Sequence, residues 1–144
     1  MKGKRLKVKR YLSLAAVFGV CVMVVMSLMA GCQDAMRPTA RAIADNSALT
    51  GEYLVRGIGL SHVKYGGEVD VEELADGSLS LEWRIDGQKW SGKGSITEDG
   101  KLFVVYTGFA AGDGTWVLMS NNELHGEWRE EGIEGFATEV WVRK

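Results

Sequence analysis

Cysteine, proline and histidine are scarce in this 144-residue sequence, and each scarcity excludes something. Cysteine occurs only at positions 21 and 32, and Cys21 lies inside a long apolar run, so residues after Cys32 have no partner for an internal disulfide. Pro38 is the single proline, and a proline-free chain from 39 to 144 suits a sheet that uses its backbone amides. The two histidines, His62 and His125, have no Cys, His or Asp neighbours at ligand spacing, which argues against a metal site.

Acidic residues are absent from the start of the chain, where basic residues gather. The segment MKGKRLKVKR carries six Lys and Arg, and the uncharged segment YLSLAAVFGVCVMVVMSLMAG follows it. This order is typical of a bacterial secretory signal. Taking these six from the 17 Lys and Arg leaves 11 against 19 Asp and Glu, so the chain from Cys32 onward has a net charge of −8. An acidic domain is repelled by phosphate backbones, and we therefore expect no nucleic-acid partner.

The apolar run ends in the sequence Met29-Ala30-Gly31-Cys32, which resembles the lipobox of bacterial lipoprotein precursors. The resemblance implies cleavage between Gly31 and Cys32 and attachment of diacylglycerol and palmitate to Cys32. Acyl chains together with a diacylglyceryl thioether anchor a protein stably in a membrane. Because Gln33 stands where an inner-membrane lipoprotein usually has Asp, the resemblance implies the outer membrane, facing the periplasm. The alternative is an uncleaved membrane helix, since about 20 apolar residues can span a bilayer.

Three regions follow from this division of the chain. Residues 1–31 are predicted to be the signal peptide, 32–48 a lipidated flexible tether, and 49–144 one small β domain. The tether residues are mostly small and polar, as expected of a spacer. A short helix over 40–46 is the alternative for part of this segment.

Strands with a period of two dominate the region after residue 49. In SLSLEWRID, for example, apolar residues alternate with polar ones, which predicts an antiparallel strand with one wet face. Turns are predicted at Asp-Gly pairs 76–77, 86–87, 99–100 and 113–114, and at Asn121-Asn122. The predicted strands are 51–58, 66–74, 78–85, 89–97, 101–107, 115–120, 123–130 and 136–143. The fold class is therefore all-β, an antiparallel up-and-down meander of about eight strands closing into a small barrel, with a rolled sheet or sandwich as the alternative.

Two short stretches echo each other within this meander. LTGEY (49–53) opens the first strand and LHGEW (124–128) lies in the seventh. A Gly-x-aromatic motif at the start of an eight-stranded meander resembles the calycin-like barrels, which include lipocalins and avidins. The chain departs from lipocalins because it lacks their C-terminal helix and disulfide, and it has no avidin-type biotin set. The resemblance implies a barrel architecture, and no binding residue is carried over from it.

Large aromatic residues cluster on the predicted inner face. They are Tyr53, Trp83, Trp90, Tyr106, Trp116 and Trp128. These rings either fill the barrel, with Gly92, Gly94 and Gly126 making space for them, or line a cavity for an apolar or planar ligand. Trp141 is out of phase with Val140 and Val142, so we expect it to face outward unless the last strand carries a bulge.

The functional reading is a non-catalytic binding module. No nucleophile–base set, phosphate loop, dinucleotide motif or metal-ligand pattern occurs, so no cofactor, metal or catalytic residue is predicted. The expected partners are the membrane, through the lipid anchor at Cys32, and a small lipophilic or aromatic ligand. The alternative is an envelope protein–protein interaction module, such as a hydrolase inhibitor or a structural envelope lipoprotein.

Overall fold

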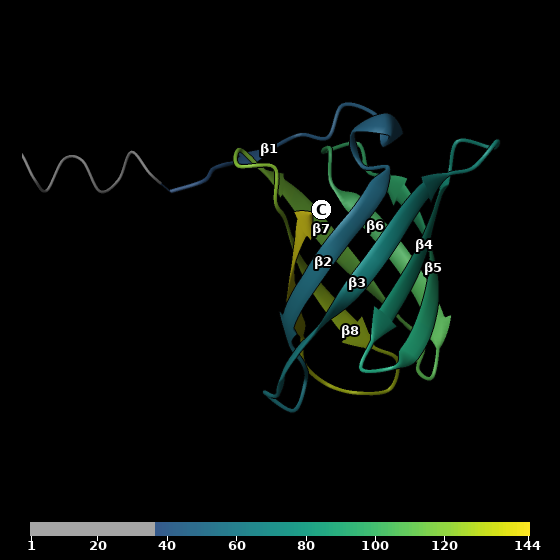
Figure 1. Cartoon of the computed structure of the whole chain (residues 1–144), viewed down its shortest axis with the longest axis vertical. Coiled ribbons are helices and arrows are strands. Elements are labelled where there is room, and N and C mark those ends of the chain that lie inside the picture. Colours follow the sequence, from purple (N-terminus) through teal and green to yellow (C-terminus); the bar gives the residue numbers. More distant parts are fainter. Residues whose placement is uncertain (1–36) are drawn as a thin grey trace, which may run out of the picture. The chain divides into compact units, whose positions relative to one another are not determined.

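The fold of residues 37–144 is a closed antiparallel β-barrel, described by a computed structural model (Figure 1). The predicted signal peptide and Cys32 lie outside the described residues. Eight strands form the barrel wall. They are β2 (Gly51–Ile58), β3 (Lys64–Glu73), β4 (Leu79–Ile85), β5 (Gln88–Ile96), β6 (Leu102–Gly108), β7 (Gly112–Met119), β8 (Leu124–Glu130) and β9 (Ala137–Arg143).

Each strand of the wall pairs with the next one along the chain, and β9 pairs back onto β2. This last pairing joins Tyr53 to Arg143 and continues without interruption to Ile58 and Thr138. All backbone edges of the eight strands are thereby used, which removes the exposed edges of an open sheet. The prediction of an all-β meander that closes into a barrel is confirmed.

Four of the five predicted turns are found, and the turn predicted at Asp113-Gly114 is wrong. At Asp86-Gly87 both residues have positive φ, 50° and 78°, as a two-residue hairpin between β4 and β5 requires. Asp113-Gly114 instead lies inside β7, and the chain reverses before it, at 109–111. Gly114 faces inward there, because a Cβ at this position would lie 2.6 Å from the Trp116 ring. The Asp-Gly pair thus serves packing and not chain reversal.

One end of the barrel is covered by the chain that precedes β2. The two-residue strand β1 (Ala40–Arg41) pairs with the end of β7, and a 3₁₀ helix, Asn46–Ala48, follows. Asp45 caps this helix by accepting a hydrogen bond from the backbone N–H of Ala48. Leu49, which follows the helix, is fully buried at this end. No helix appears over 40–46, and none within 37–144 is long and apolar enough to cross a bilayer.

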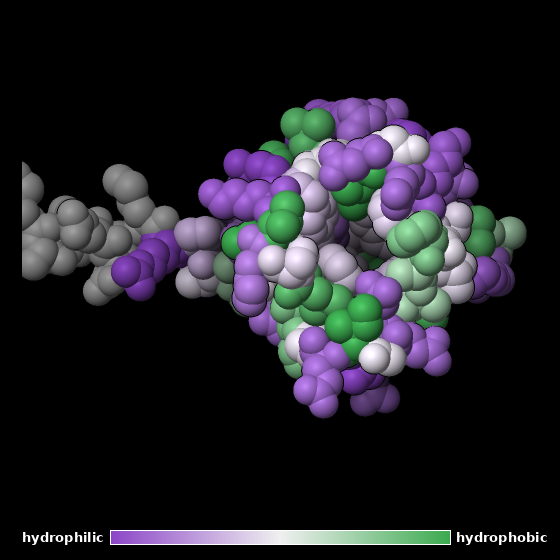
Figure 2. All heavy atoms as spheres, turned by 90° about the horizontal axis from the view of Figure 1, so that it is seen from below, coloured by the Kyte–Doolittle hydropathy of each residue, from purple (hydrophilic) through white to green (hydrophobic). Residues whose placement is uncertain are grey.

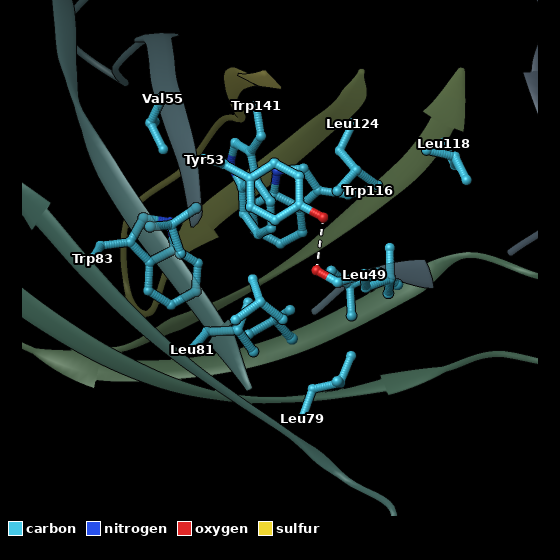
Figure 3. Packing of buried hydrophobic residues seen from close by; sticks show 14 of the residues in the cluster. Leu49, Tyr53, Val55, Leu79, Leu81, Trp83, Trp116, Leu118, Leu124 and Trp141 are labelled. Atoms are coloured by element: carbon cyan, nitrogen blue, oxygen red, sulfur yellow. Dashed lines mark hydrogen bonds between the residues drawn. The ribbon is translucent and has the colours of Figure 1, made fainter. Parts of the chain in front are cut away.

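The closed half of the barrel is packed solid with aliphatic side chains (Figure 3). The fully buried members are Leu49, Val55, Val69, Val71, Leu79, Leu81, Leu102, Val104 and Leu124. They meet a layer of rings at mid-height, in which Trp116 and Trp141 lie 4.7 Å apart between centroids and Tyr53 lies 5.9 Å from Trp141. This layer separates the packed half from the other end.

The expectation that Trp141 faces outward is wrong, since its side chain is completely buried. Strand β9 pairs with both neighbours without a bulge, so Ala137, Glu139 and Trp141 all point inward and Val140 lies on the outer face. The physical reason is that Glu139 accepts a hydrogen bond from the Trp141 indole N–H at 2.6 Å. The inward carboxylate therefore has a donor two residues away on the same face.

Candidate ligand cavity

A cavity of about 420 Å³ occupies the other half of the barrel. It opens at the end formed by the β2–β3, β4–β5, β6–β7 and β8–β9 connections, and Figure 2 looks into this end and shows it hollowed at its centre. The lining residues from the connections include Leu60, Phe109 and Ile133. This volume falls within the usual range for small-molecule sites, about 300–1,000 Å³.

Five of the six predicted inner-face aromatics line this cavity. They are Trp83, Trp90, Tyr106, Trp116 and Trp128. The sixth, Tyr53, belongs to the packed half, where its hydroxyl donates to the backbone oxygen of Leu49 at 2.6 Å (Figure 3). The two alternatives for these rings, core filler and cavity lining, therefore both occur, at different heights in the same barrel.

The rings of the cavity wall are fixed against one another. Trp128 lies between Tyr65 and Tyr106, at centroid distances of 6.4 and 6.1 Å, and both pairs meet edge to face. Each such pair contributes about 0.5–1.5 kcal/mol beyond the burial of apolar area. The Tyr106 hydroxyl also donates to the backbone oxygen of Arg129 at 2.9 Å. These contacts hold the wall open without a ligand to support it.

Inward glycines make room for the large rings, as predicted. A Cβ on Gly92 would lie 2.9 Å from the Trp83 ring, and one on Gly126 would lie 2.2 Å from the Trp116 ring. Both distances are shorter than non-bonded carbon atoms tolerate, so an indole occupies the space that a side chain at each of these positions would need. Gly94 does the same for aliphatic side chains, since a Cβ there would lie 3.0 Å from Leu81.

Glu139 is the one charged side chain of the described residues that lies deep in the barrel, with 3% of its surface exposed. It comes from β9 and lines the inner part of the cavity. Its Oε2 accepts from the Trp141 indole at 2.6 Å, and its Oε1 accepts from the Tyr65 hydroxyl at 3.1 Å. Both donors are neutral, and no Lys, Arg or His of residues 37–144 forms an ion pair with this carboxylate.

Burial is the main cause that raises the pKa of Glu139 to about 7. The hydrogen bonds from Trp141 and Tyr65 favour the ionised form and oppose this rise, and the nearby indoles of Trp83 and Trp116 act in the same direction. The Trp116 Nε1–H is itself buried and has no hydrogen-bond partner in the described chain. The floor of the cavity thus presents a carboxylate near its ionisation point beside an unpaired N–H donor.

Tyr65 connects the floor of the cavity to its wall. Its hydroxyl donates to Glu139 and accepts from the Trp128 indole N–H at 2.8 Å. Burial raises the pKa of Tyr65 well above its usual range, and the neighbouring Glu139 carboxylate adds to the rise. The hydroxyl therefore keeps its proton and remains a donor to the carboxylate.

The sequence analysis did not identify Glu139 or Tyr65 as site residues. Glu139 lies two residues from both Ala137 and Trp141, so period two places all three on the same face of the strand. This spacing was the sequence signal for an inward carboxylate. Tyr65 lies just before the predicted start of its strand at 66, although β3 begins at Lys64. His125 lies on the outer face of β8, where its Nε2 contacts Glu123 at 2.8 Å, outside the cavity.

The cavity is lined mainly by apolar and aromatic side chains. Within residues 37–144 no three His, Cys, Asp or Glu side chains come close enough together to bind a metal ion. Comparisons of the chain with protein-family models, with curated proteins and with solved structures found no match.

Proposed function

We propose that this protein is a lipid-anchored envelope protein that binds a small apolar or aromatic molecule inside its barrel. The observation that carries the proposal is the cavity of about 420 Å³, walled by four tryptophans and two tyrosines and open at one end. Such a concave, mostly apolar space with few polar groups is typical of small-molecule sites. Binding requires no chemistry, and we propose no catalytic role.

The sequence before the barrel supports the anchored part of the proposal. Cys32 follows the small residues Ala30 and Gly31 and is the one cysteine after the apolar run. Lipidation there would attach the membrane through a segment that joins the barrel beside β7, at the closed end. The cavity opens at the end of the barrel opposite to β1.

Native mass spectrometry of the mature protein, recovered gently from its own membrane, tests both parts. A mass increment of diacylglyceryl or triacyl-cysteine on Cys32 supports the anchor, and an uncleaved, unmodified chain contradicts it. A small-molecule adduct that dissociates on activation supports the binding function. If no adduct appears and aromatic probes do not alter the tryptophan fluorescence of the protein, the binding function is contradicted.

A protein-interaction role is a second candidate, favoured by the apolar side chains around the open end. Val63, Phe109 and Phe136 are 64%, 84% and 66% exposed, respectively, and each lies in a different connection at this end. A photo-crosslinking residue in place of Phe136 tests this role in the native envelope, with the same residue in place of Leu54 on the outer wall as the control. A defined protein captured from position 136 and not from 54 would support an interaction surface.

A further inference from the structure

We propose that the ligand of this cavity is an organic cation, an amine carried on an aromatic or apolar body, with Glu139 as its counter-ion. This assignment rests on the proposed binding function and specifies its ligand class. It follows from three features of the described residues, namely a carboxylate without an opposite charge, the aromatic rings that line the cavity and the charge of the open end.

The first feature is that Glu139 has hydrogen-bond donors but no opposite charge. Its partners, Tyr65 and Trp141, offer one neutral donor each, so every carboxylate oxygen retains acceptor capacity. A buried carboxylate is costly unless a cation compensates it. A protonated amine inserted from the cavity would supply both the missing charge and further donors.

The second feature is the aromatic lining around this carboxylate. Trp83 and Trp116 lie on the floor, 6.3 Å apart between centroids, and Tyr65, Tyr106 and Trp128 form the adjoining wall. The faces of such rings carry negative potential and attract cations within about 6 Å of the ring centre. An anionic ligand would lie beside the ionised Glu139 carboxylate, which would repel it.

The third feature is the net negative charge of the open end. Its strand ends and connections carry Asp86, Asp113, Glu130, Glu131 and Glu134 against Lys64, Arg84, Lys89 and Arg129, and Arg84 is already paired with Asp70 and Glu68. Arg129 is paired with Asp113 at 2.9 Å, which leaves the acidic excess in place. Glu130 also lines the cavity. Clefts with one sign of charge raise the local concentration of oppositely charged ligands.

The test compares three probes of similar shape on the full-length protein in detergent, by isothermal titration calorimetry. Phenethylamine is cationic below about pH 9, 2-phenylethanol is neutral and 3-phenylpropionate is anionic above about pH 6. At about pH 8 we expect the amine to bind at least about tenfold more tightly than the alcohol, and the acid to bind most weakly.

Substitution of the carboxylate locates the preference. Glu139→Gln keeps the shape of the side chain and should reduce the preference for amine over alcohol to less than about threefold, a loss of most of the charge-dependent affinity. Glu127→Gln, on the exposed outer face of β8, is the matched control and should leave the preference unchanged. Near-UV circular dichroism establishes that each variant is folded.

A pH series on the unaltered protein provides a test that needs no variant. The titratable groups facing Glu139 are Tyr65 from β3 and Tyr106 from β6, with Glu130 of β8 at the cavity wall. Burial raises the pKa of both tyrosines, so neither loses its proton near neutrality. The preference for the amine over the alcohol should therefore grow as pH rises from about 5.5 to about 8.5, because Glu139, whose pKa is about 7, becomes ionised over this range.

The outcomes separate the ligand class from the binding function. If the alcohol or the acid binds as tightly as the amine, or if Glu139→Gln retains the preference, the cation assignment is wrong while the binding function stands. A preference that falls with rising pH also overturns it, because a neutral Glu139 would then be donating to the ligand. If none of the probes binds, the cation assignment is wrong, and the binding function then fails as well if native mass spectrometry shows no small-molecule adduct.

Discussion

The Tyr65 hydroxyl reaches Glu139 across an intervening strand. Tyr65 belongs to β3 and Glu139 to β9, and the residue that pairs with both of them is Gly57 of β2. The tyrosine ring lies over this glycine, so that its hydroxyl contacts the Glu139 carboxylate at 3.1 Å. A residue without a side chain thus permits the contact that orients the polar group of the cavity.

Substituting Gly57 by alanine should disrupt this arrangement. A Cβ there would lie 2.2 Å from the Tyr65 ring, so the ring must move and its hydrogen bonds to Glu139 and Trp128 must weaken. Overpacking of this kind costs about 1–3 kcal/mol in the free energy of unfolding, measurable by urea titration. Gly66→Ala on β3 is the control, because a Cβ at that position would lie 3.5 Å from its nearest neighbour. Equal stability losses for the two variants would contradict the proposed role of Gly57.

Glu139 should make the stability of the barrel depend on pH. Its pKa in the folded state, about 7, exceeds the ordinary glutamate value of 4.5, so the folded state holds the proton more tightly than the unfolded state. The stability that this group contributes is complete below about pH 4.5 and is lost as pH rises through about 7. At about 1.4 kcal/mol for each unit of pKa, the loss amounts to about 3 kcal/mol.

The difference between the unaltered protein and Glu139→Gln isolates this contribution. Exposed carboxylates whose pKa values are lowered, such as Asp99 beside Lys101, act in the opposite direction but are common to both proteins. The difference in unfolding free energy, measured by urea titration at several pH values, should decline from about pH 4 to about pH 8. A difference that does not vary with pH would show that Glu139 titrates normally.

Much of the fold could be predicted because alternation along the chain is a local property. The strand predicted over 51–58 matches β2 at both ends, and the inward positions of Trp83 and Trp128 follow from period two. The site could be predicted less completely. A carboxylate normally lies at the surface, and the alternation in β9 offered Val140 and Val142 as the apolar face.

The burial of Glu139 depends on contacts that alternation does not encode. Its donors include Tyr65 on β3, which becomes a neighbour only when β9 pairs with β2 and the barrel closes. The cavity has the same origin, because its volume depends on which inward positions lie at the same height. Near the open end these include Gly57, Gly112 and Gly114, whose neighbouring space is occupied by the rings of Tyr65, Tyr106 and Trp116. Alternation along one strand does not show which rings from other strands fill such spaces.

Replacing Cys32 by serine should abolish the proposed anchor and leave the barrel intact. A serine hydroxyl cannot form the thioether to diacylglycerol, and Cys32 lies before the described barrel. We expect the variant to lose its lipid mass increment, as measured by mass spectrometry. Ala30→Ser, which keeps a small residue before the cysteine, is the control and should still be lipidated. An unaltered protein and a Cys32→Ser protein of the same lipid-free, uncleaved mass would favour the uncleaved helix.

The segment before β2 should contribute to the stability of the barrel through Leu49. This side chain is fully buried at the closed end, and its backbone oxygen accepts from the Tyr53 hydroxyl at 2.6 Å. Arg143 holds the same segment from β9, donating to the backbone oxygens of Ala48 and Thr50. Leucine-to-alanine changes in a packed core lower the free energy of unfolding by about 2–5 kcal/mol, whereas the same change at a half-exposed leucine lowers it much less.

Leu49→Ala should therefore lower the free energy of unfolding by about 2–5 kcal/mol, measured by urea titration. Leu54→Ala is the matched control, since Leu54 lies on the outer wall of β2 and is 48% exposed. Ligand binding at the open end should survive in the folded fraction of both variants, because the ring layer of Trp116 and Trp141 separates Leu49 from the cavity. A Leu49→Ala protein as stable as Leu54→Ala would mean that the segment lies on the barrel without closing it.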